Sequence, residues 1–145
     1  MKRLYKVLIL VVMFALCSFS YAQQSIIGHW LIVDDKTGQR RAIVHLDVNH
    51  GRLTGTIVEV FAQIGDTGLC SKCPEQFKNK PIKGLQFVWG LKDSGNGRWG
   101  GGQILDAKSG KIYRVNMTVK GDKLYVRGYI GLSLLGRTQI WNRHG

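Results

Sequence analysis

The sequence contains little proline, acid or cysteine, and it lacks the residue patterns that most enzymes need. Of its 145 residues, two are proline, nine are acidic and three are cysteine. No serine lies in a nucleophile-elbow setting, the four histidines lack metal-ligand spacing, and the glycine clusters have no helix after them to form a phosphate loop. The carboxylates come singly, at Asp47, Glu59, Asp93 and Asp106. We therefore predict neither an enzyme nor a cofactor.

The first 22 residues have the layout of a signal peptide. Lys2, Arg3 and Lys6 supply positive charge, residues 7–17 form an unbroken apolar run, and Ser20 and Ala22 fit a cleavage site after residue 22. The alternative, a retained membrane helix, is disfavoured because 11 apolar residues fall well short of the roughly 20 that span a bilayer. We expect an exported protein, periplasmic or secreted.

Residues 23–145 are then the mature chain, long enough for a single domain with one core. They keep 18 basic and all nine acidic residues, a net charge of +9. Such a protein is drawn to anionic surfaces such as those of the cell envelope. The charges are scattered singly, however, so we predict no specific nucleic-acid partner, and the oligomeric state stays open.

Short β-branched and aromatic runs separated by glycine-rich turns dominate the mature chain, and no segment keeps helical spacing over three turns. The predicted strands are residues 30–33, 42–48, 53–61, 85–91, 99–105, 112–119, 123–130 and 137–143. On the fourth of these, Leu85, Phe87, Trp89 and Leu91 are expected to share a face.

About eight strands joined mostly by short turns predict an all-β fold, an antiparallel up-and-down barrel with an interior that is filled or holds one small ligand. Residues 62–83 are the exception to the short turns, being long for a connection in a compact domain. They could supply the crossing connection of a two-sheet sandwich, the main competing architecture.

Barrel closure is predicted from both ends of the strand series. Gly28 and Trp30 open the first strand and Arg143 ends the last, an arrangement that resembles the Gly-x-Trp and Arg signature of lipocalins and related calyx barrels. A guanidinium stacked on an indole gains about 1–2 kcal/mol when partly desolvated. The contact would also join the first strand to the last, so we expect a structural role for these three residues.

Three pairs of segments form a longer pattern: Pro81-Ile82-Lys83-Gly84-Leu85 with Trp89-Gly90-Leu91-Lys92, then Trp99 to Asp106 with Gly110-Lys111-Ile112-Tyr113, and Leu124 to Gly131 with Gly136 to Arg143. Together they resemble a bacterial family, domain of unknown function 2147. The resemblance covers residues 26–143 and implies an exported lipocalin-like barrel without an established activity. Ala107 departs from the proline that the family usually has after the aspartate.

Cys70 and Cys73 remain after the signal peptide is removed. In an oxidising compartment we expect them to form a disulfide that pins the 62–83 connection. A reactive redox pair is the sharper alternative, but the helix N-terminus that lowers a thiol pKa is not predicted here. A zinc site with His45 and His50, or a reduced pair, also stays open.

Aromatic and cationic residues gather on the later strands and form the candidate ligand-binding set: Trp89, Trp99, Tyr113, Tyr125, Arg127 and Tyr129. Tyr125, Arg127 and Tyr129 alternate with Leu124, Val126 and Ile130, so one face fills the barrel and the other does not. If the Tyr/Arg face points inward, it lines a cavity for an amphipathic anion. If it points outward, it is an exterior stripe.

The preferred function is an extracytoplasmic barrel that binds a small hydrophobic or amphipathic molecule, with residues 62–83 bordering its mouth. The alternative is a basic module with a filled core that docks on anionic envelope components or a protein partner. Thiol redox chemistry is a third hypothesis.

Overall fold

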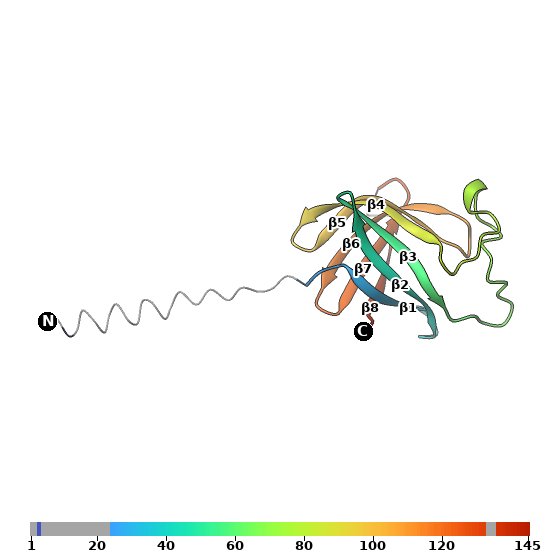
Figure 1. Ribbon diagram of the computed structural model, residues 1–145, viewed down its shortest axis with the longest axis horizontal. Coiled ribbons are helices and arrows are strands. Elements are labelled where there is room, and N and C mark those ends of the chain that lie inside the picture. Colours follow the sequence, from blue (N-terminus) through green and yellow to red (C-terminus); the bar gives the residue numbers. More distant parts are fainter. Residues whose placement is uncertain (1–2, 4–23, 133–135) are drawn as a thin grey trace.

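The chain folds as a closed, eight-stranded antiparallel barrel, seen in a computed structural model that describes residue 3, residues 24–132 and residues 136–145 (Figure 1). Each strand pairs with the next in sequence, and β8 returns to pair with β1. The strands are β1 (Gly28–Val33), β2 (Arg40–Asn49), β3 (Arg52–Val60), β4 (Gln86–Gly95), β5 (Arg98–Leu105), β6 (Ile112–Lys120), β7 (Lys123–Tyr129) and β8 (Arg137–Arg143). The predicted fold class is confirmed and the sandwich is excluded. The predicted signal peptide lies almost wholly outside the described residues.

The up-and-down order gives the barrel two distinct ends. The N-terminal end carries residues 24–27 and the β2–β3, β4–β5 and β6–β7 turns, and the loop end carries the other four connections. In Figure 1 the β4–β5 and β6–β7 turns lie at one side of the barrel and the long β3–β4 connection lies at the other. No helix in the described part of the chain is long and apolar enough to cross a membrane.

Alternating apolar residues from every strand fill the barrel core. The largest side chains that are less than 2 % exposed are Trp30, Trp141, Leu46, Leu53, Leu91, Leu105, Met117 and Leu124. None of the polar or charged residues in the described part of the chain is buried. Burial of this apolar surface is the main stabilising contribution to such a fold.

The face of β4 differs from the prediction because its register against β3 shifts twice. Leu53 pairs with Leu91, Gly55 with Val88 and Thr56 with Gln86, so β4 holds two extra residues over this span. Gly90 has a φ of 80°, a conformation open to glycine. As a result Val88 is fully buried, whereas Trp89 is only partly buried and packs outside the ladder against Phe77. The expectation that Trp89 shares a face with Phe87 and Leu91 was wrong.

The β3–β4 connection is ordered by its own contacts at the loop end. Cys70 and Cys73 are paired as a disulfide, and both are buried in the same hydrophobic cluster as the barrel core. A backbone bridge joins Leu69 to Pro81, and a 3₁₀ turn spans Glu75–Phe77. The Lys72 carbonyl lies so close to Gly110, in the β5–β6 turn, that a Cβ there would be 1.8 Å from it. The connection therefore packs down on the neighbouring turn.

Candidate functional site

The N-terminal end is held together by contacts between the two ends of the chain. Arg143 stacks on the Trp30 ring with its Cζ 4.3 Å from the ring centroid, and the two residues are paired in the β1–β8 ladder. The Trp30 indole N–H donates to the Ile26 carbonyl at 2.9 Å. One Arg143 nitrogen donates to the Ser25 carbonyl at 2.8 Å, so residues 25–26 are fastened across this end.

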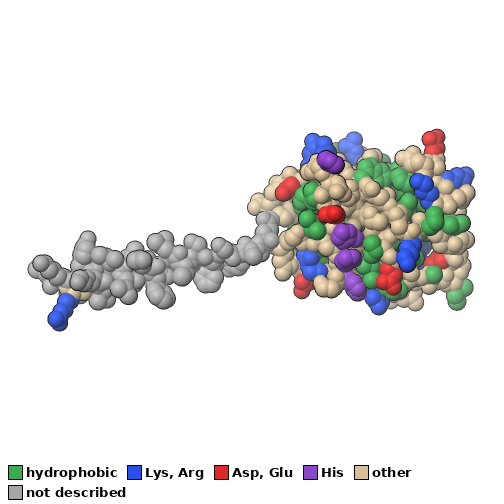
Figure 2. All heavy atoms as spheres, in the orientation of Figure 1, with side chains coloured by type: hydrophobic (Ala, Val, Ile, Leu, Met, Phe, Trp, Pro, Cys, Tyr) green, Lys and Arg blue, Asp and Glu red, His purple; other side chains and the backbone are tan. Residues whose placement is uncertain are grey.

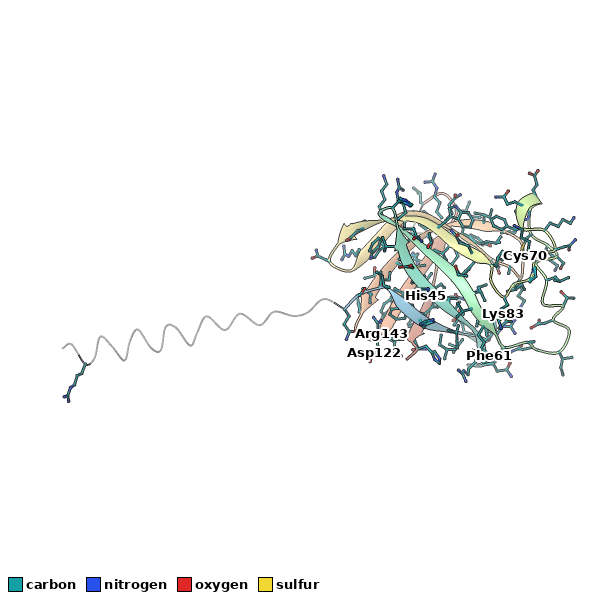
Figure 3. All side chains as sticks on the ribbon, viewed as in Figure 1. His45, Phe61, Cys70, Lys83, Asp122 and Arg143 are labelled. Atoms are coloured by element: carbon teal, nitrogen blue, oxygen red, sulfur yellow. A yellow bond between two sulfur atoms is a disulfide. The ribbon has the colours of Figure 1, made fainter. Side chains whose placement is uncertain are left out.

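Gly28 lies beside that stack in a backbone conformation that favours glycine. Its φ is 134°, and a Cβ at this position would lie 3.7 Å from an Arg143 nitrogen. Arg143 Nε is 4.0 Å from a carboxylate oxygen of Asp122, in the β6–β7 turn. Figure 3 shows these two side chains together at one end of the barrel and Cys70 at the other. The structure thus places Gly28, Trp30 and Arg143 in one closure contact.

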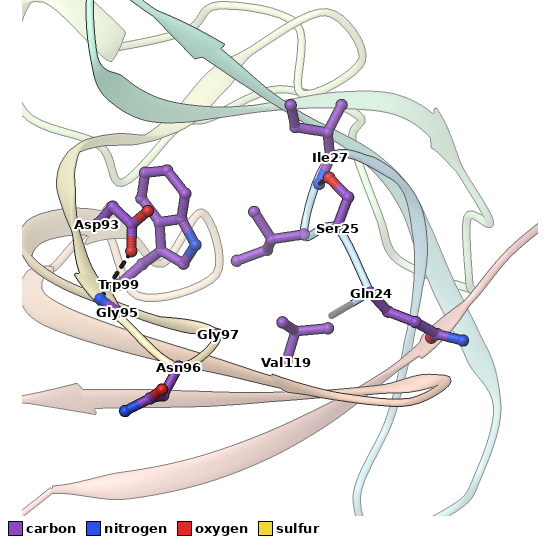
Figure 4. A pocket seen from close by; sticks show the side chains of 10 residues that line it. Gln24, Ser25, Ile27, Asp93, Gly95, Asn96, Gly97, Trp99 and Val119 are labelled. Atoms are coloured by element: carbon purple, nitrogen blue, oxygen red, sulfur yellow. Dashed lines mark hydrogen bonds between the residues drawn. The ribbon is translucent and has the colours of Figure 1, made fainter. Parts of the chain in front are cut away.

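A hollow of about 210 Å³ lies beside this closure (Figure 4). Residues 24–27 form one wall, the β4–β5 turn forms another, and Trp99 and Val119 complete the lining. Asp93 lies at the end of β4, just before that turn, where its carboxylate accepts a hydrogen bond from the Gly95 backbone N–H at 2.8 Å. Of the predicted ligand-binding set, Trp99 alone lines this hollow.

At the loop end, the side chains that point into the barrel are less deeply buried. Alternation from Trp30, Val115 and Trp141 directs Ile32, Tyr113 and Gln139 inward, and all three are half-buried. Gln139 accepts a hydrogen bond from the Trp141 indole at 3.2 Å, which places a carboxamide beside the apolar core. Gly128, which shares a face of β7 with Leu124 and Val126, also faces inward here, and a Cβ added to it would meet only ordinary contacts.

The open question about β7 is resolved by burial. Leu124 and Val126 are buried in the core, whereas Tyr125, Arg127 and Tyr129 are half-buried on the outer face. The Tyr/Arg face is therefore an exterior stripe. The six candidate ligand-binding residues do not converge: three lie on this stripe, Trp89 packs outside on Phe77, and Trp99 and Tyr113 lie toward opposite ends of the barrel.

The exterior stripe belongs to a larger basic face on β6, β7 and β8. The outward positions of these strands include Arg114, Lys120, Lys123 and Arg127 and carry no carboxylate. Arg127 donates to the Thr138 hydroxyl at 2.8 Å, and Lys120 Nζ lies 5.1 Å from the Tyr125 ring centroid. Contacts between neighbouring side chains therefore hold Tyr125, Lys120 and Arg127 in place on this face.

The two cysteines do not lie near any histidine. The disulfide lies at the loop end, His50 lies in the β2–β3 turn at the N-terminal end, and His45 pairs with His29 on the barrel wall. Among the residues that the structure describes, no three His, Cys, Asp or Glu side chains converge as metal ligands in their present rotamers. The zinc site with Cys70 and Cys73 is therefore not supported.

Comparison with known proteins identifies the family. Residues 28–143 match DUF2147, described as an uncharacterized protein conserved in bacteria. The chain belongs to the DUF2147 family. The fold is similar to that of protein HP1028 from the human pathogen Helicobacter pylori, which belongs to the lipocalin family. That match has a TM-score of 0.72 at 18 % identity and covers 83 % of this chain and 84 % of the other. No curated protein sequence matches.

Because the fold is lipocalin-like, residues that face the barrel interior are also site candidates. The amino-acid composition of the chain did not identify them. Gln139, Ile32 and Gly128 were absent from the predicted site. Counting back two positions from Trp141 would have found Gln139, because residues two apart on a strand share a face. Aromatic enrichment instead selected residues on both faces.

Proposed function

We propose that this protein is an exported, non-enzymatic barrel that binds a small hydrophobic or amphipathic molecule through its loop end. The observation that carries the proposal is the difference in burial along the barrel axis. Inward apolar side chains near Trp30, such as Val44 and Trp141, are almost completely buried, whereas Ile32, Tyr113 and Gln139 near the loop end are partly accessible. Eight-stranded barrels of this kind are wide enough to hold one small ligand.

The chemistry of the loop end suits an amphipathic ligand. Ile32 and Tyr113 offer apolar surface, and the Gln139 carboxamide offers a polar group beside the Trp141 indole. Ligand sites typically combine predominantly apolar walls with a few placed polar groups. The disulfide-pinned β3–β4 connection borders this end and would limit access to it.

Titration with cis-parinaric acid, a fluorescent fatty acid, tests the proposal. Gly128→Phe should fill the mouth and weaken probe binding by about tenfold, because the new ring occupies the space in front of Tyr113. Tyr125→Ala is the matched control, since it removes an aromatic ring from the outer face of the same strand and should change binding by less than about twofold. Equal binding by both variants, or none by the wild type, contradicts the proposal.

A second candidate function has its own supporting observation. The outer face of β6–β8 gathers Arg114, Lys120, Lys123 and Arg127, and the outward positions of these three described strands hold no Asp or Glu, which suits docking to an anionic envelope polymer. Binding by this face should fall steeply with added salt and should be lost in a Lys123→Glu/Arg127→Glu variant. Binding in the barrel interior should be nearly independent of salt and unaffected by that variant.

A further inference from the structure

Three of the four histidines, which are far apart in sequence, come together on the outside of the barrel. His29 on β1 and His45 on β2 are direct cross-strand partners, with ring centroids 4.8 Å apart. His144 follows β8, and its backbone N–H donates to the His29 carbonyl at 2.9 Å. Because Arg143 is paired with Trp30, His144 occupies the next position along the ladder, beside His29.

The three side chains share the outer face. Trp30 and Arg143 point toward the barrel axis, so their neighbours His29 and His144 point outward, and both are exposed. His45 lies between the buried residues Val44 and Leu46 and is half-buried. Figure 2 shows histidine side chains in a row on one face of the barrel.

We propose that His29 and His45 bind one divalent transition-metal ion, Cu²⁺ or Zn²⁺, with His144 as a third ligand. Neutral imidazole is a favourable ligand for both metals. Tetrahedral ligands at 2.0–2.1 Å from zinc have nitrogens about 3.3 Å apart. Directly opposed residues on antiparallel strands have Cβ atoms about 5 Å apart, so rotation of the two imidazoles brings their nitrogens to this separation.

Binding of the ion would require the imidazole side chains to rotate toward one another. No three potential ligands already converge in the described part of the chain, so metal binding requires a change of rotamer, with water in the remaining positions. The exposure of His29 and His144 permits that change. This inference does not rest on the interior ligand site, because the histidine row lies on the outer surface of the barrel wall.

Calorimetric titration of the untagged, metal-free protein with CuCl₂, and separately with ZnCl₂, tests the site near neutral pH. We expect one ion per chain. His29→Ala and His45→Ala should each weaken binding by about tenfold, and His144→Ala by about threefold. His50→Ala is the matched control, since His50 lies in the β2–β3 turn, and it should change affinity by less than about twofold.

Electron paramagnetic resonance of the Cu²⁺ complex gives a second readout, with hyperfine coupling to imidazole nitrogens expected in the wild type and reduced in His29→Ala. If an alanine variant loses its folded circular dichroism, His29→Asn and His45→Asn replace it. Wild-type affinity in the His29 and His45 variants, a loss in His50→Ala that matches theirs, or a spectrum without nitrogen coupling overturns the proposal.

Discussion

The two ends of the barrel are built from different kinds of chain. The N-terminal end has three short polar turns and is crossed by residues 24–27, which Trp30 and Arg143 fasten. The loop end has the long β3–β4 connection with its disulfide. Large apolar side chains are exposed in its loops, with Ile64 107 %, Ile130 65 % and Leu132 68 % exposed. The first end depends on contacts between the two ends of the chain. The second combines local contacts within the β3–β4 connection with an ion pair between Asp35 in the β1–β2 turn and Arg137 on β8.

The two ends are therefore expected to contribute differently to global stability and to access to the interior. Contacts that join β1 to β8 close the ring of strands, so their loss should destabilise the whole barrel. Contacts within the β3–β4 connection order one segment, so their loss should loosen only the loop end. The following predictions test that division, from the largest expected effect to the smallest.

Replacing Trp30 should have the largest effect. Trp30→Ala removes a fully buried indole, its hydrogen bond to Ile26 and the stack on Arg143, and should lower the free energy of unfolding by about 3–5 kcal/mol. Urea unfolding followed by circular dichroism measures this change. The comparison of the two ends fails if the loss is confined to residues 24–27 and global stability stays within about 1 kcal/mol of wild type.

Removing the disulfide should have a smaller and more local effect. The double change Cys70→Ala/Cys73→Ala opens a short loop and should cost about 2 kcal/mol in the chain-entropy account. Limited proteolysis should then cut within residues 62–83 while the strands stay resistant. Simultaneous cleavage throughout the barrel would show that the connection stabilises the whole fold and not only its mouth.

The strands, their order and the closure contact could be predicted because each depends on a local pattern. Alternation marked the strands, glycine-containing turns separated them, and a Gly-x-Trp with a final Arg marked the two strands that meet. The facing of Trp89 could not be predicted, because it depends on bulges at the β3–β4 pairing. Such shifts leave no periodic signal in one strand alone.

The candidate site was predicted less well for a related reason. The candidates were chosen by residue type, whereas a site in the interior requires residues on the inward face. Tyr125 and Tyr113 are both aromatic, but they lie on opposite faces of the barrel wall. The row of His29, His45 and His144 depends on the register of three strands, including the pairing of the last strand with the first. Their spacing in sequence therefore carried no indication of it.

Replacing Arg143 by lysine should weaken the contacts that close the N-terminal end of the barrel. Lysine keeps the positive charge but lacks the planar group that stacks on Trp30 while donating to the Ser25 carbonyl. We expect a loss of about 1 kcal/mol in urea unfolding, together with faster hydrogen exchange of the Trp30 indole N–H. An unchanged exchange rate would mean that charge alone fastens residues 24–27.

The smallest effect is expected in the β1–β2 turn at the loop end. Backbone N–H groups of Thr37 and Lys36 donate to the Asp34 carboxylate and hold its pKa below the ordinary value for aspartate. These bonds favour the ionised folded form, so their contribution is present above the ordinary pKa and is lost as the pH falls through the lowered one. Carboxyl-carbon NMR should show Asp34 titrating at a lower pH than in an unfolded peptide. Because this carboxylate lies in a surface turn, Asp34→Ala should loosen the turn and leave the urea midpoint almost unchanged. A large shift of that midpoint would show that the loop end, too, helps to hold the barrel closed.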